Sequence, residues 1–180
     1  FVPTARRTTA YADAPLQIVP GRFLLDPRSF AKLLQLAEIK ETDNVLDVGC
    51  ATGYSSAVLA RIGAKVTGLE QDADLVRAAV ETLPAVGAAN AAAVQGSLVD
   101  GHKSGAPYDV IFVNGAIEVR PSVLLSQLAE GGRLVAIVKT SAQGHGTVFL
   151  NDHGRIGSRA DFDADAALLP GFREKAGFVF

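Results

Sequence analysis

Short apolar runs alternate along this chain with segments in which apolar residues recur every three or four positions. The short runs are typical of strands, and the recurring pattern is typical of helices that bury one face. Strands are predicted at residues 45–48, 65–69, 91–95, 109–113, 133–138, 147–150 and 177–180. Helices are predicted at residues 27–38, 53–62, 72–83 and 121–128. Asp26 and Asp72 are suitable N-caps, and Gly131-Gly132 is expected to end the last helix.

Strands that alternate with helices predict an α/β fold with a doubly wound, mostly parallel seven-stranded sheet. No repeat or linker divides the sequence, so residues 1–180 are expected to form a single domain. Residues 1–26 contain three prolines and are expected to be an irregular arm. The acids between Asp161 and Asp165 are interpreted as a solvated helix face. In such sheets ligands bind beyond the carboxyl ends of the strands.

The loop between the first two predicted strands carries the strongest functional signal. Asp47 lies two residues before Gly49, Gly53 follows four residues later, and Glu70 ends the second strand. A dinucleotide fingerprint needs glycines where this chain has Ala51 and Tyr54. The P-loop pattern also fails, because no Gly-Lys-Ser/Thr follows.

S-adenosylmethionine has a use for each element of this loop. Its carboxylate can lie against backbone N–H groups at the start of the helix. Asp47 is placed to meet its ammonium, and Glu70 to accept hydrogen bonds from both ribose hydroxyls. An acid at the position of Glu70 would suit an NAD ribose equally well, so the loop spacing is what favours the methyl donor.

Composition narrows the remaining possibilities. The chain of 180 residues has a net charge of −2 and is 48% hydrophobic, so neither nucleic acid nor an anionic membrane is an expected partner. No apolar run approaches the roughly 20 residues of a membrane span. The chain starts at Phe1 with neither Met nor a signal-peptide pattern, so it is expected to be trimmed. The single cysteine, Cys50, fits a reducing compartment, and the cytoplasm is the expected location.

Other reactive residue types carry weaker signals. Cys50 has no histidine partner in sequence and is interpreted as a small loop residue. The three histidines, His102, His145 and His153, lack metal-ligand spacing, and no metal is expected. Asn114 follows a buried strand and faces the expected cleft, where a functional role and simple turn-making remain equal alternatives.

These segments together resemble the protein-L-isoaspartate O-methyltransferase family, which uses S-adenosylmethionine to methylate isoaspartyl carboxylates in proteins. The likeness covers nearly the whole chain. It is carried by residues 1–3 (FVP), 10–18, 44–60 (NVLDVGCATGYSSAVLA), 106–116 (APYDVIFVNGA) and 124–138 (LLSQLAEGGRLVAIV). The resemblance implies a sheet of the Rossmann-like methyltransferase type, with S-adenosylhomocysteine as the product. It also implies that the arm at 1–26 contributes to the acceptor side.

The loop positions and the resemblance together assign roles to particular residues. Arg22 and Asn114 become candidates for the catalytic side, with Arg22 pairing with an acceptor carboxylate. Cofactor binding is assigned to Asp47, Gly49, Cys50, Ala51, Gly53, Tyr54, Glu70, Gln71, Gly96, Ser97 and Leu98.

Two departures from the family pattern stand out. The family's stretch G-Q-T-I-S-Q-P reads GRFLLDP at residues 21–27, so Phe23 and Leu25 replace a threonine and a serine. The family implicates that serine in handling the acceptor, and leucine cannot donate a hydrogen bond. Gly96 is followed by Ser97 where the family tends to place an acid near the adenine.

Three alternatives to the repair reaction follow. The acceptor could be another protein carboxylate or a small molecule. The chain could be a binding module that keeps the cofactor without catalysis. An NAD-dependent oxidoreductase is the weakest of the three. The oligomeric state is not indicated by the sequence.

Overall fold

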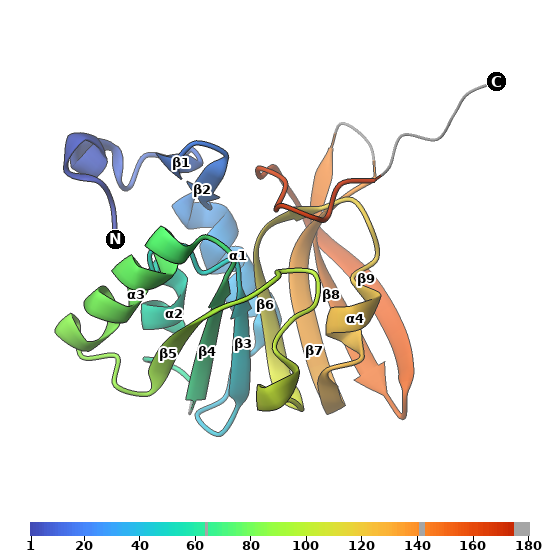
Figure 1. Ribbon diagram of the computed structural model, residues 1–180. Helices are drawn as coiled ribbons and strands as arrows, with labels where there is room; N and C mark the ends of the chain where they lie inside the picture. The colour runs from blue at the N-terminus through green and yellow to red at the C-terminus, as the bar shows by residue number, and fades with distance from the viewer. Residues whose placement is uncertain (64, 141–142, 175–180) are drawn as a thin grey trace.

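A computed structural model describes residues 1–63, 65–140 and 143–174 (Figure 1). Its centre is a seven-stranded sheet in the order β5-β4-β3-β6-β7-β8-β9, which confirms the predicted fold class. β8 alone runs opposite to the other strands of this sheet, because it pairs antiparallel with both β7 and β9. The strands are β3 (Asn44–Val48), β4 (Lys65–Glu70), β5 (Ala91–Gln95), β6 (Tyr108–Ile117), β7 (Leu128–Lys139), β8 (Gly144–Asp152) and β9 (Arg155–Ala164).

Helices lie on both faces of the sheet (Figure 1). On one face, α1, α2 and α3 bury apolar side chains against alternate residues of the central strands. The opposite face is covered by α4 and by irregular segments that include Leu98 and Phe172. The helices are α1 (Pro27–Ala37), α2 (Tyr54–Leu59), α3 (Ala73–Ala85) and α4 (Ser122–Leu125), with 3-10 turns η1 (Thr4–Thr9) and η2 (Lys103–Gly105).

Both predicted N-caps are confirmed. Asp26 accepts a hydrogen bond from the N–H of Ser29 at 2.8 Å, and Pro27 occupies the first turn of α1. Asp72 accepts bonds from the N–H groups of Asp74 and Leu75 at the start of α3. These bonds satisfy amides that have no partner within the helix.

The arm at 1–26 is more regular than predicted. It contains η1 and a small antiparallel hairpin of β1 (Leu16–Val19) and β2 (Arg22–Leu24). The hairpin is held by Leu16 and Ile18, which are buried against the body of the protein. Because β2 contacts β6, this hairpin lies over the carboxyl ends of the central strands.

Two predictions in the second half of the chain are wrong. The helix expected at 121–128 is the single turn α4, and Gly131-Gly132 lies within β7 instead of capping a helix. The acids at 161–165 belong largely to β9, not to a helix face, because Phe162 alternates with exposed Asp161 and Asp163 and packs on Gly146. The strand expected at 177–180 lies outside the described residues.

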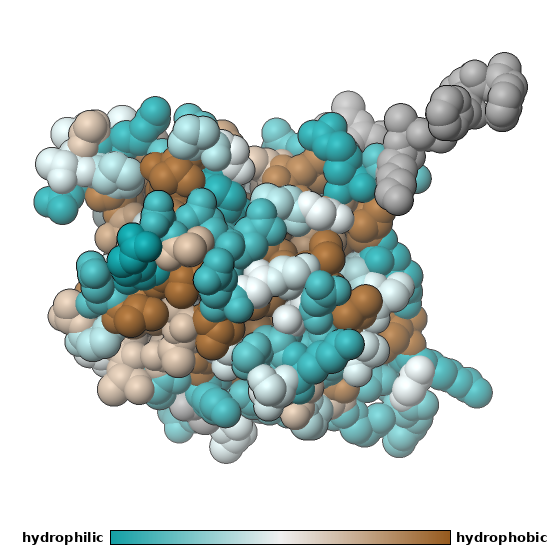
Figure 2. Space-filling view, viewed as in Figure 1, coloured by the Kyte–Doolittle hydropathy of each residue, from teal (hydrophilic) through white to brown (hydrophobic). Residues whose placement is uncertain are grey.

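On the face that Figure 2 shows, apolar side chains do not gather into one continuous patch. The face in Figure 2 mixes hydrophilic side chains with separate hydrophobic patches. Within the described part of the chain, no helix combines the length and the apolar character needed to cross a membrane.

Candidate cofactor site

The loop from Gly49 to Gly53 is a tight turn between β3 and α2. Gly49 (φ 79°), Ala51 (φ 53°) and Gly53 (φ 89°) are all left-handed, a region that costs a non-glycine residue roughly 1–2 kcal/mol. The N–H groups of Gly49 and Cys50 donate to the carbonyl oxygen of Leu69 at 2.8 and 3.2 Å. The loop is therefore fixed to the end of β4, directly beside Glu70.

Glu70 collects four hydrogen-bond donors while fully buried. Oε1 accepts from the N–H groups of Gln71 and Asp72 at 2.8 and 3.2 Å. Oε2 accepts from the N–H of Ala51 at 3.0 Å and from Nη2 of Arg22. A carboxylate offers about four acceptor positions, so those of Glu70 are all in use.

Arg22 reaches this carboxylate from β2. Its side chain is buried, and its Nη2 forms a salt bridge with Oε2 of Glu70. Its Nε is also buried and has no hydrogen-bond partner among the described residues. The guanidinium lies beside the cofactor loop, since Nη2 is 3.5 Å from the position that a Cβ on Gly49 would take.

Asp47 is a second buried carboxylate at the same edge of the sheet. Its Oδ2 accepts from the hydroxyls of Ser55 and Ser56 at 2.7 and 2.5 Å, and its Oδ1 accepts from Nδ2 of Asn114. Burial raises its pKa from 3.8 to about 6, although hydrogen bonds from the two serines and Asn114 oppose that shift. Asp47 thus joins β3, α2 and β6 around the loop.

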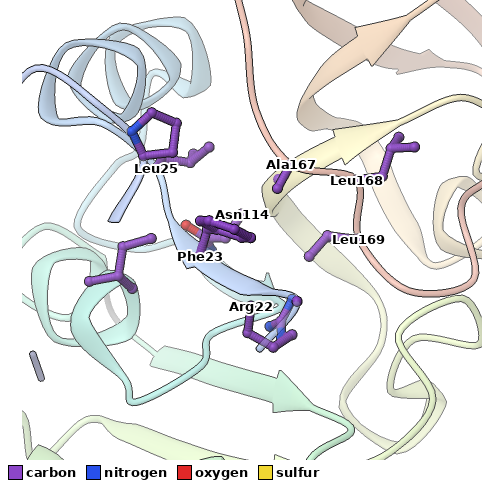
Figure 3. A pocket seen from close by; sticks show the side chains of 11 residues that line it. Arg22, Phe23, Leu25, Asn114, Ala167, Leu168 and Leu169 are labelled. Carbon is purple, nitrogen blue, oxygen red and sulfur yellow. The ribbon is translucent and has the colours of Figure 1, made fainter. Parts of the chain in front are cut away.

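A segment that follows β9 covers the loop from the other side. Ala116 exchanges hydrogen bonds with this segment, donating to Ala167 and accepting from Leu169, both at 2.9 Å. Leu169 then lies 3.0 Å from the Cβ position of Gly49 and 2.7 Å from that of Gly115. Figure 3 shows Leu169 and Ala167 facing Arg22, Phe23 and Asn114 across the site. The cavity between them is about 10 Å³.

A larger cavity of about 260 Å³ adjoins the site beneath the arm. Its lining is mostly apolar and includes Leu24, Leu25, Phe30 and Tyr54, together with Arg7. A separate gap of about 10 Å³, lined in part by the same Leu25, Phe30 and Tyr54, lies against Gly49 and Asn114. Tyr54 packs against the ring of Phe30 with centroids 5.6 Å apart, so its side chain belongs to this cavity.

The remaining predicted cofactor residues surround Glu70 to different degrees. Gly96 donates its N–H to the carbonyl oxygen of Glu70 at 2.9 Å. Leu98 is buried in the core, whereas Gln71 and Ser97 are exposed. Burial, and next the charges of Asp47 and Glu70, raise the pKa of the Cys50 thiol, which stays protonated. That state agrees with its interpretation as a small loop residue.

Three residues of the site were not predicted. Ser55 and Ser56 hold Asp47, and their hydroxyls on the buried side of the first helical turn were an available signal. Leu169 reaches Gly49 from 120 positions away in the sequence, and no local pattern indicates such a contact.

Two solved structures share this architecture over most of the chain. A protein-L-isoaspartate O-methyltransferase superposes with a TM-score of 0.80 at 24% identity, over 91% of this chain and 55% of that chain. A protein from Plasmodium falciparum, described as a putative protein-L-isoaspartate O-methyltransferase in complex with S-adenosyl-L-homocysteine, gives 0.72 at 21% identity, over 87% and 80%. These likenesses show that the fold is of the Rossmann-like methyltransferase type.

Sequence comparison identifies the family. The model for "Protein-L-isoaspartate(D-aspartate) O-methyltransferase" matches residues 1–160. A protein-L-isoaspartate O-methyltransferase of Methanoculleus marisnigri is 38% identical over 77% of this chain and 63% of its own length. A relative from Rhodopseudomonas palustris is 34% identical over 94% and 69%. The chain belongs to the protein-L-isoaspartate(D-aspartate) O-methyltransferase family. It spans about three fifths of the length of several of these relatives.

Proposed function

We propose that this protein is an S-adenosylmethionine-dependent methyltransferase that methylates an isoaspartyl or related carboxylate of a protein or peptide. The observation that carries the proposal is the position of Glu70. This carboxylate ends β4 and lies beside the Gly49–Gly53 loop. A nucleoside bound at the loop would place its ribose hydroxyls next to Glu70.

The residues present fit S-adenosylmethionine. Glu70 would hold the ribose, backbone N–H groups of the loop would meet the methionine carboxylate, and Asp47 would meet the ammonium. Asp47 is mostly ionised at pH 7, since its pKa of about 6 lies below that value. When bound, the cofactor supplies an electrophilic methyl group on a sulfonium.

A carboxylate acceptor suits a site without a strong base. Such an acceptor is already ionised at pH 7, so the protein has to align it and exclude water. Burial raises the pKa of Tyr54, with a further contribution from Tyr11, so the Tyr54 phenol stays protonated. Cys50 is likewise protonated, and neither group is placed to remove a proton.

The acceptor side is proposed to lie under the arm. We propose that residues 1–180 form a single domain and that residues 1–26 cover the 260 Å³ cavity. The small gap at Gly49 and Asn114 shares Leu25, Phe30 and Tyr54 with this cavity, so an acceptor held in the cavity would lie close to the cofactor loop. Arg22 remains a candidate partner of the acceptor carboxylate, and unchanged turnover and acceptor affinity in Arg22→Ala would rule this role out.

The direct test is methyl transfer from labelled S-adenosylmethionine to an isoaspartyl peptide. The matching aspartyl peptide is the control, since it differs only in which carboxylate joins the backbone. We expect label in the isoaspartyl peptide alone. Protein that binds S-adenosylhomocysteine but labels neither peptide would contradict the proposed acceptor.

One observation favours a second candidate, a methyltransferase with a different acceptor. Leu25 and Phe23 place apolar side chains where the family pattern has hydroxyls. Leu25 lines both small cavities that reach Asn114 and also the larger cavity beneath the arm. An acceptor with a large apolar group, either a protein or a small molecule, would fit this lining. Loss of catalysis, with the cofactor retained, is the remaining alternative.

Restoring the hydroxyl distinguishes the first two candidates. Leu25→Ser should raise kcat/KM for the isoaspartyl peptide by roughly 3–10-fold, the effect of one added hydrogen bond. Leu24→Ser is the matched control, because Leu24 lines the same cavities but does not stand at the family's serine position. An equal loss of activity in both variants would favour an apolar acceptor.

We also propose that the protein acts in the cytoplasm. The single cysteine is compatible with a reducing compartment.

A further inference from the structure

We propose that Arg22 competes with the cofactor for Glu70 and so sets the affinity of the site for the nucleoside. The inference rests on the proposed cofactor function and adds a property to it. In the arrangement described above, the ribose-binding carboxylate is already bound by a side chain of the protein itself.

The competition follows from the number of acceptor positions on Glu70. Three are taken by backbone N–H groups of Ala51, Gln71 and Asp72, which belong to the loop and to the start of α3. The fourth is taken by Nη2 of Arg22. A ribose diol brings two further donors, and Arg22 is the only one of these four donors that a side-chain rotation can remove.

The contact between Arg22 and Glu70 leaves one donor of the guanidinium unsatisfied. The Nε of Arg22 is buried without a partner among the described residues, and an unsatisfied buried donor costs roughly 1–3 kcal/mol. This cost offsets part of the salt bridge. Displacement of Arg22 by a ligand would return Nε to water or to a new acceptor.

Leu169 closes the same space from the opposite side. Its side chain covers the loop at Gly49, next to the guanidinium of Arg22. Entry of a nucleoside would therefore require movement of both residues. Arg22 is the better residue to test, because its effect on affinity depends on one positive charge and on one contact, between its Nη2 and Oε2 of Glu70.

The test measures binding by calorimetry with two probes and four proteins. S-adenosylhomocysteine has the whole product structure, whereas 5′-methylthioadenosine keeps the adenine and ribose and lacks the amino acid part. The proteins are wild type, Arg22→Met, Arg22→Lys and Arg28→Met. Methionine keeps the bulk of the side chain without a donor, and lysine keeps the charge. Arg28 is an exposed arginine of α1 and serves as the control.

We expect Arg22→Met to bind both probes about tenfold more tightly than wild type, which corresponds to about 1.4 kcal/mol. Arg22→Lys and Arg28→Met should stay near wild type. Thermal unfolding without ligand checks that each variant is folded. The ligand-induced rise in Tm should be largest for Arg22→Met.

Binding of 5′-methylthioadenosine by folded Arg22→Met no tighter than by wild type would overturn the competition. An equal gain in affinity in Arg28→Met and Arg22→Met would also overturn the competition. Absence of binding to every protein would instead contradict the cofactor function, and this inference with it. The two failures are thus distinguishable.

Discussion

Glu70→Ala is expected to weaken the binding of S-adenosylhomocysteine by about a hundredfold. Each hydrogen bond from a ribose hydroxyl to a charged acceptor contributes roughly 1.5–3 kcal/mol, and the variant loses both. The gain from no longer displacing Arg22 recovers only part of that loss. Calorimetry measures the affinity directly, and Glu81→Ala on the exposed face of α3 is the matched control.

The same variant should also be less stable without ligand. Removing Glu70 leaves the buried guanidinium of Arg22 unpaired, a change that typically costs about 3–5 kcal/mol. The double variant Glu70→Ala/Arg22→Met should recover much of this stability and none of the affinity. If the double variant regained the affinity, Glu70 would not be the ribose partner.

Asp47→Asn is expected to change how stability depends on pH. The pKa of Asp47 is raised in the folded protein to about 6, so its protonated form favours folding. This contribution is fully present below about pH 4 and is lost as the pH rises through about 6. The contribution of Asp47 to the free energy of unfolding should therefore fall by about 3 kcal/mol across that window, and this part of the pH dependence should be absent from Asp47→Asn.

Urea unfolding of both proteins at several pH values measures this difference. The stability of Asp47→Asn relative to wild type should rise between pH 4 and pH 7. Asp74→Asn, which removes an exposed carboxylate of α3, controls for the loss of one charge. Parallel curves for wild type and Asp47→Asn would show that burial does not raise the pKa of Asp47.

The sequence predicted the parts of the fold that depend on local patterns. Strands β3, β4 and β5 and helices α1 and α3 were located within a few residues, because apolar spacing and the caps Asp26 and Asp72 agree with each other there. The length of the helix at 121–128 was overestimated, because its apolar residues continue directly into β7. The acids of β9 were misassigned because alanine and aspartate obscured the alternation around Phe162.

The sequence predicted those parts of the site that lie in or next to the Gly49–Gly53 loop. Asp47, Gly49, Gly53 and Glu70 lie at the carboxyl ends of adjacent strands, as their spacing indicated. What no spacing could indicate is the contact of Arg22 with Glu70, because it depends on how the β1–β2 hairpin lies over the sheet. The contact of Leu169 with Gly49 likewise depends on hydrogen bonds to Ala116, at the distant end of β6.

The attachment of Leu169 to β9 has a consequence for how affinities at this site are understood. A side chain that reaches Gly49 on a short covalent connection acts as a tethered occupant, with an effective concentration on the order of millimolar or higher. A free nucleoside displaces the side chain only when the ratio of its concentration to its dissociation constant exceeds the corresponding ratio for the tethered side chain. The apparent dissociation constant of any ligand here therefore reflects chain connectivity as well as the contacts that the ligand makes.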